Sequence, residues 1–149
     1  MKISLLILMV TSVSSYASTC PQLDGTYFCK RGPVDSFEIV SHSENNITSY
    51  KINDDFITAD GKTVINTHTD VEDLKLHTES KHECVNNKLI SKMDVIVDND
   101  TTDYKKGDVL ISSLEELSNS PKGTLVFHQL YKARGGIFED YTFCEKSPY

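Results

Sequence analysis

The chain has 149 residues, a formal net charge of −7 at neutral pH and 38% hydrophobic residues. This length suits one domain with a single core. Its basic residues occur singly or in pairs, which argues against binding to nucleic acid or to an anionic membrane. No phosphate-binding loop and no G-x-S-x-G nucleophile motif is present, so an enzyme is not expected.

Residues 1–18 are predicted to be a secretory signal peptide. Lys2 precedes an apolar run over residues 3–10, and Ser15-Tyr16-Ala17 fits the small-x-small pattern of a cleavage site. The run is shorter than the roughly 20 residues that a bilayer span requires, so cleavage is favoured over a membrane anchor. Residues 19–149 are therefore expected to form a single exported domain, periplasmic or secreted, with no membrane span.

All four cysteines lie in this exported part, at positions Cys20, Cys29, Cys84 and Cys144. They form no C-x-x-C pair and are spread over the whole chain, which favours two disulfides over a metal site.

From Gly25 onward the chain has the short alternating runs of β-strands, separated by Asn, Asp and Gly. Strands are predicted, in chain order, over residues 26–31, 36–43, 47–52, 56–58, 63–68, 72–84 and 89–97. A weaker strand is expected over 104–112. Residues 113–117 are predicted as one helical turn because Ser113 and Glu116 have the spacing of a capping box. A last hairpin joins 125–131 to 137–145 around a turn at 134–136.

Eight to ten strands joined by tight turns indicate an up-and-down antiparallel meander. Closing such a sheet removes its exposed edges, so the predicted fold is a small all-β barrel of 8–10 strands, lipocalin-like and stapled by disulfides. Closure would lay the last strand beside the first and favours Cys29–Cys144 with Cys20–Cys84. Four cysteines allow three pairings, and the sequence does not choose among them.

The sequence contains only weak candidates for metal or catalytic residues. The histidines show no set of three ligands on one strand face, so surface histidines are favoured over a metal site. The aspartates at 94, 98, 100 and 103 lack the glycine and the terminal glutamate of an EF-hand loop. Other carboxylates fall in turns, where they cap the backbone. No metal ligand, catalytic residue or cofactor is predicted.

The aromatic residues on the predicted strands give the candidate binding site. A barrel of this size encloses either packed side chains or one small ligand. The residues predicted to line a ligand cavity are Tyr27, Phe37, Ile39, Tyr50, Phe127, Tyr131 and Tyr141.

Three resemblances bear on function. Leu23-Asp24-Gly25-Thr26-Tyr27 resembles the first strand of lipocalin-like (calycin) barrels, with Tyr27 in place of their tryptophan, and Thr102-Asp103-Tyr104 resembles their T-D-Y element. Residues 20–29 are similar to small exported bacterial proteins that open C-P-x-L-x-G-x-Y-x-C. The periplasmic inhibitors of C-type lysozyme are also small disulfide-bearing barrels, but their S-G-x-x-Y loop has no counterpart in this sequence. The calycin resemblance implies binding of a small apolar molecule.

The expected function is therefore non-enzymatic binding of a small apolar ligand by an exported protein. The alternative is a protein-interaction module, such as an enzyme inhibitor, that acts through the loop at 98–106 or the loop at 118–123. An apolar cavity would favour the first function, and a filled barrel with a protruding polar loop would favour the second.

Overall fold

The computed structural model describes residues 20–30, 35–71 and 73–148. These residues form ten strands and no helix. The strands are β1 (Gly25–Cys29), β2 (Ser36–Glu44), β3 (Ile47–Ile52), β4 (Asp55–Ala59), β5 (Thr63–Val71), β6 (Leu74–Val85), β7 (Lys88–Val97), β8 (Val109–Asn119), β9 (Leu125–Ala133) and β10 (Gly136–Lys146). The described chain thus offers no helix that could cross a membrane. The predicted signal peptide falls outside the described residues.

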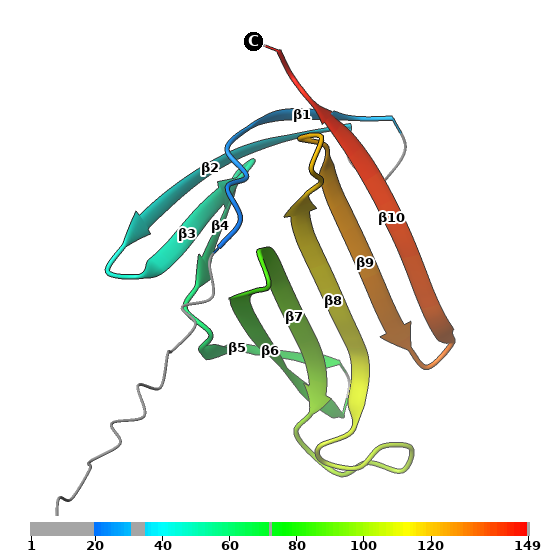
Figure 1. Ribbon diagram of the computed structural model, residues 1–149. Helices are drawn as coiled ribbons and strands as arrows, with labels where there is room; N and C mark the ends of the chain where they lie inside the picture. Colours follow the sequence, from blue (N-terminus) through cyan, green and yellow to red (C-terminus); the bar gives the residue numbers. More distant parts are fainter. Residues whose placement is uncertain (1–19, 31–34, 72, 149) are drawn as a thin grey trace, which may run out of the picture.

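All ten strands belong to one antiparallel sheet in the order β4-β3-β2-β1-β10-β9-β8-β7-β6-β5. Every neighbouring pair is also adjacent in sequence except β1 and β10, which pair along Tyr27 to Cys29. The predicted up-and-down meander is confirmed, as is the position of the last strand beside the first (Figure 1).

Two of the hairpins have asparagine at both central positions of their turns. Asn45 and Asn46 connect β2 to β3, and Asn86 and Asn87 connect β6 to β7, all four with positive φ. Two-residue hairpins need a left-handed backbone at both central positions, and asparagine tolerates that conformation better than most residues. These turns fix the register of the strands that follow them.

The predicted helical turn at 113–117 is wrong, because these residues lie in the middle of β8. Leu114 pairs with Lys92 of β7 and Leu130 of β9, while Leu117 pairs with Leu89 and Phe127. Pairing on both sides outweighs a local capping signal that could form only one hydrogen-bonded turn. The weaker strand expected from residue 104 begins at Val109.

The sheet is a curled half-barrel. The structure supports the predicted antiparallel meander but does not confirm the closed lipocalin-like barrel. β4 and β5 form the two edges, and no ladder joins them within the described ranges. Gly61, in the turn between these strands, instead donates its N–H to the carbonyl of His82 at 2.9 Å. The curl brings the edges together through this turn.

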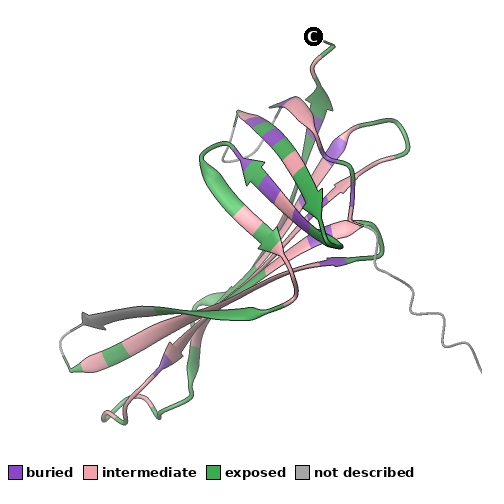
Figure 2. Cartoon of the chain, turned by 90° about the vertical axis from the view of Figure 1, so that its left-hand side faces the viewer, coloured by how far each residue is buried: buried purple, intermediate pink, exposed green. Residues whose placement is uncertain are grey.

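The main core cluster fills one end of the half-barrel, where β1–β4 fold over the ends of β6–β10 (Figures 1 and 2), while Val97, at the far end of β7, is buried apart from this cluster. The buried cluster consists of Leu23, Tyr27, Phe37, Ile39, Tyr50, Ile52, Cys84, Leu89, Leu117, Leu125, Phe127 and Cys144. We call this end the upper half, as drawn in Figure 1, and the remainder of β5–β10 the lower half.

Two disulfides staple the upper half, Cys20–Cys84 and Cys29–Cys144. Cys29 and Cys144 lie directly opposite each other on paired strands, with their Cα atoms 4.0 Å apart. The favoured pairing is confirmed. Disulfides of this kind suit an oxidising environment, extracellular or periplasmic.

Candidate functional site

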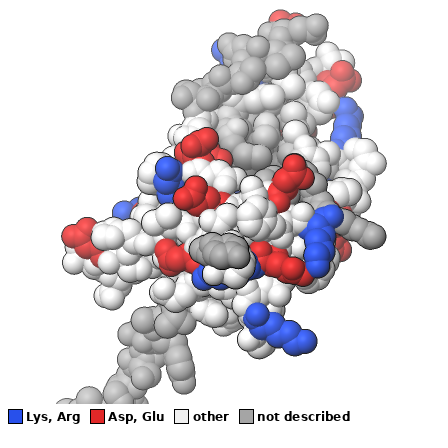
Figure 3. Space-filling model, turned by 90° about the horizontal axis from the view of Figure 1, so that it is seen from above, with Lys and Arg blue, Asp and Glu red and all other residues white. Residues whose placement is uncertain are grey.

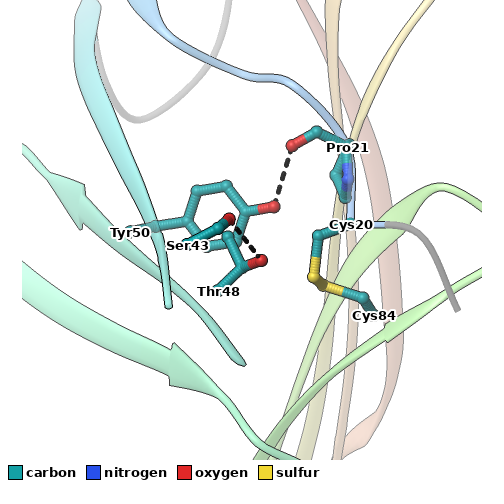
Figure 4. Close-up of a disulfide and its surroundings, with 6 residues drawn as sticks. All are labelled: Cys20, Pro21, Ser43, Thr48, Tyr50 and Cys84. Carbon is teal, nitrogen blue, oxygen red and sulfur yellow. Dashed lines mark hydrogen bonds between the residues drawn. A yellow bond between two sulfur atoms is a disulfide. The ribbon is translucent and has the colours of Figure 1, made fainter. Parts of the chain in front are cut away.

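The segment that precedes β1, residues 20–24, forms a strap that is tied to the body of the sheet (Figure 4). The Cys20–Cys84 disulfide anchors its first residue to β6. The Tyr50 hydroxyl donates to the Pro21 carbonyl at 2.8 Å, and the Asn119 side-chain amide donates to the carbonyl of Gln22. The strap is therefore held against the sheet, with Pro21 and Leu23 fully buried.

A carboxylate completes the attachment of the strap. Asp24 accepts hydrogen bonds from the backbone N–H and the hydroxyl of Ser41, both at 2.6 Å. Burial alone would raise the pKa of Asp24, but these two hydrogen bonds hold the pKa below its usual value. The strap is thus fixed to β2, β3, β6 and β8.

Five of the seven predicted ligand-lining residues belong to the packed core. These are Tyr27, Phe37, Ile39, Tyr50 and Phe127. Burial raises the pKa of the Tyr50 phenol to about 12. Phe37 and Phe127 pack edge to face with ring centroids 5.6 Å apart. In the upper half these side chains fill the space that a ligand would need.

The other two predicted residues lie on opposite faces of the sheet. Tyr131 is opposite Phe138 on the concave face, which carries the core. Tyr141 is opposite His128 on the convex face, where the two rings stack 4.3 Å apart. The structure therefore does not bring the seven residues together in one cavity.

Below the core, the concave face continues as regular rows of side chains across β6–β10. The first row, which we call the polar row, is His82, Ser91, Glu115, Gln129 and Asp140. Within it, His82 Nδ1 and the Ser91 hydroxyl lie 2.9 Å apart, and Gln129 donates to Glu115 at 3.1 Å.

The second row, which we call the aromatic row, is Ser80, Met93, Ser113, Tyr131 and Phe138. Its large apolar members remain open to solvent, with Tyr131 39% and Phe138 59% exposed. Two exposed aromatic rings in register on neighbouring strands offer a flat surface for an apolar molecule.

Two hollows follow these rows and together form what we call the concave groove. One, of about 200 Å³, lies against the core between β4 and β7–β9, and its lining includes Ile57, Ser91, Glu115 and Phe127. The other, of about 360 Å³, is lined by Gln129, Tyr131, Phe138 and Asp140. Glu115 of the first hollow is hydrogen-bonded to Gln129 of the second, so the hollows adjoin.

Charge is divided between the two faces of the sheet. The lysines of β6–β9, at positions 75, 81, 88, 92 and 132, all occupy convex positions. Asp55, Glu115 and Asp140 border the concave groove. Among the described strand residues, the only lysine or arginine on the concave side is Lys146, beside Tyr27 at the upper end. Seen from above, acidic and basic side chains are interspersed (Figure 3).

Convex carboxylates are paired with basic side chains. Lys88 binds Glu116 at 2.8 Å, and His128 bridges Glu116 at 3.5 Å and Glu139 at 2.9 Å. The hydrogen bond from Lys88 lowers the pKa of Glu116. This network resembles the ion pairs of an ordinary protein surface.

The loop between β7 and β8 is held at its base by β6. His77 Nδ1 lies 2.7 Å from Asp98, which raises the pKa of the imidazole. Asn99 accepts from the Lys75 N–H and donates to the Asp73 carbonyl, both at 2.8 Å. The loop is thus ordered rather than a free arm.

A recess of about 510 Å³ lies between this loop and the convex face. Arg134 lies over the Tyr104 ring, 5.0 Å from its centroid, and donates to its hydroxyl at 2.9 Å. Lys132 and Arg134 share the lining with Asp103 and Asp108. Its formal charges balance, so the recess favours no particular sign of ligand.

The fold does not gather the aspartates at 94, 98, 100 and 103 into a calcium site. Asp98 binds His77, and Asp100 accepts from the Lys106 N–H at 2.9 Å. Within the part of the chain that the structure describes, no three His, Cys, Asp or Glu side chains are grouped as metal ligands.

Glu115, Gln129, Asp140 and Phe138 were missed by sequence reasoning. Glu115 fell in the mistaken helical turn, and the other three were not singled out. A signal was present, because Ile111, Ser113, Glu115 and Leu117 alternate as one face of a strand. Pairing that strand with its neighbours would have placed Glu115 beside Gln129.

Comparison with known proteins adds no family to this description: no family model, no curated protein and no solved structure matches the chain.

Proposed function

We propose that this protein is an exported, non-enzymatic binding protein that holds a small, largely apolar molecule in the concave groove. The observation that carries the proposal is the pair of hollows that follow the polar row and the aromatic row. Ligand sites are typically concave and mostly apolar, with a few placed polar groups. The groove has that composition, with Tyr131, Phe138 and the core as its apolar part.

The packing of the upper half supports this location. Disulfides, strap and core make that half rigid, and the strands of the groove extend directly from it. Binding surfaces built on strands hold their geometry better than surfaces built on loops. A ligand would therefore meet a preformed surface.

Native mass spectrometry of the protein isolated from the cell that exports it tests the proposal. We expect an adduct of a few hundred daltons that is lost on denaturation. The matched variants are Phe138→Ala and Phe143→Ala, which remove equally exposed rings (59% and 57%) from opposite faces of β10. The first should lose the adduct and the second should keep it. A bare mass, together with no uptake of the neutral probe 1-naphthylmethanol, would overturn the proposal.

A second candidate function has its own observation. The ordered loop between β7 and β8 and the recess beneath it present Tyr104 and Arg134, residue types that are enriched where proteins contact one another. In this alternative the protein acts as an interaction module, such as an enzyme inhibitor. Arg134→Ala should then abolish capture of a partner by the exported protein and leave groove binding unchanged.

A further inference from the structure

We propose that the occupant of the concave groove is a small organic cation, an amine with an aromatic or branched apolar body. This inference rests on the proposed function and adds to it the charge of the ligand. Asp55, Glu115 and Asp140 are the charged residues that line the groove.

The two carboxylates of the polar row are only partly satisfied within the protein. Glu115 Oε1 accepts from Gln129, and Asp140 Oδ1 accepts from the Tyr141 backbone N–H at 2.9 Å. The second oxygen of each carboxylate has no hydrogen-bond partner among the described residues. Gln129 lies between them in register, so both residues border the same stretch of groove.

The histidine of the polar row does not compensate the negative charge of its carboxylates. Burial lowers the pKa of His82, although Glu115 and Asp60 oppose the shift, so His82 is neutral at neutral pH. The lysines of β6–β9 lie behind the sheet on the convex face, where Lys81, Lys88 and Lys92 pair with glutamates. The groove is left as a negative site beside an apolar surface.

The aromatic row supplies the contact for the apolar body of the ligand. Tyr131 and Phe138 are adjacent on β9 and β10, one row below Gln129 and Asp140. A cation near such rings gains from their electron-rich faces as well as from the carboxylates. An anion of the same shape would meet unpaired carboxylates, so the groove discriminates by charge among molecules of similar apolarity.

Three probes that share one ring system and differ in charge test the inference on the unmodified protein. They are 1-naphthylmethylammonium, 1-naphthylmethanol and 1-naphthoate, followed by calorimetry at neutral pH. We expect the amine to bind about tenfold or more tightly than the alcohol, as for a hydrogen bond to a charged group, and the naphthoate not to bind. Added salt should weaken binding of the amine and leave binding of the alcohol unchanged.

Paired variants locate the charge. Glu115→Gln with Asp140→Asn removes two negative charges from the groove, and Glu116→Gln with Glu139→Gln removes two from the next positions on the same strands, which face away. The groove variant should reduce amine affinity to that of the alcohol. The convex variant should retain it. Circular dichroism confirms that each variant is folded, and the probe comparison needs no variant.

The outcomes separate this inference from the proposed function. Equal binding of amine and alcohol, or tighter binding of naphthoate, would overturn the cationic ligand and leave an apolar binding protein. No binding of any probe would overturn both. Amine binding that the convex variant loses and the groove variant keeps would overturn the assigned site.

Discussion

The two halves of the sheet share β6–β10 but use these strands differently. In the upper half, β1–β4 cover the concave face, and Tyr27, Leu125 and Cys144 are fully buried. In the lower half nothing described covers that face, and Tyr131 and Phe138 stay open to solvent. Stability is therefore concentrated in the upper half, where the meander folds over itself. The lower half of the same strands is left free for binding.

The largest expected effect is a difference in the free energy of unfolding between two phenylalanine variants. The two residues lie on the same face of neighbouring strands. Phe127→Ala removes a core ring that is 7% exposed and should lower the free energy of unfolding by about 3–5 kcal/mol. Phe138→Ala removes a ring that is 59% exposed and should cost about 0.5 kcal/mol or less. Urea denaturation of both variants measures the difference. Equal losses would mean that the lower half is also part of the core.

A smaller effect is expected from the strap. Replacing Cys20 and Cys84 by alanine opens a link across 64 residues and should destabilise the fold by about 2–4 kcal/mol. Binding in the groove should survive in the folded population, because the groove lies below the core. The measurement is thermal unfolding alongside calorimetry with 1-naphthylmethylammonium. Loss of binding at temperatures where the variant is folded would show that the two halves are coupled.

The smallest effect concerns two histidines of β6 that titrate in opposite directions. Convex His77 donates a hydrogen bond to Asp98 and should have a pKa above 6.5, whereas concave His82 is desolvated and should have a pKa below 6.5. The His77 contribution to stability is present below pH 6.5 and lost as the pH rises through its raised pKa. The His82 contribution is present above pH 6.5 and lost as the pH falls towards its lowered pKa.

NMR titration of the imidazole signals measures both histidines. His77→Gln and His82→Gln assign the two signals and serve as controls. Shifts of the same sign for both would contradict the difference between the two faces.

Much of the fold followed from local patterns. The alternation from 72 to 97 predicted the β6–β7 hairpin. The expected position of the last strand beside the first favoured the disulfide pairing that is found, although the sequence left the other two pairings open. Residues 113–117 were misread because two glutamates between leucines fit a helix locally, and only pairing with β7 and β9 decides otherwise. Propensity is a weak guide where a strand is paired on both sides.

The binding site was harder to predict because it depends on register. A three-residue turn at 134–136 would place Tyr141 opposite Gln129 and on the concave face. The turn has two residues, Arg134 and Gly135, so Tyr141 pairs with His128 and faces outward. A slip of one residue moves every side chain of a strand to the other face. The polar row likewise depends on the register of four strand pairs, from β6–β7 to β9–β10. No single segment of the sequence reveals these four registers.

Met93 gives the most direct test that the concave groove is the binding surface. It lies in the aromatic row, and the other methionines are Met1 and Met9. With ¹³C-methyl methionine in the exported protein, and Met93→Leu to assign its signal, 1-naphthylmethylammonium is added stepwise. We predict a saturable ring-current shift of Met93 in the unmodified protein, and a shift that needs about tenfold or more probe to saturate in the Glu115→Gln, Asp140→Asn variant. A Met93 signal that stays in place while calorimetry records binding would show that the ligand lies elsewhere, and would contradict the account.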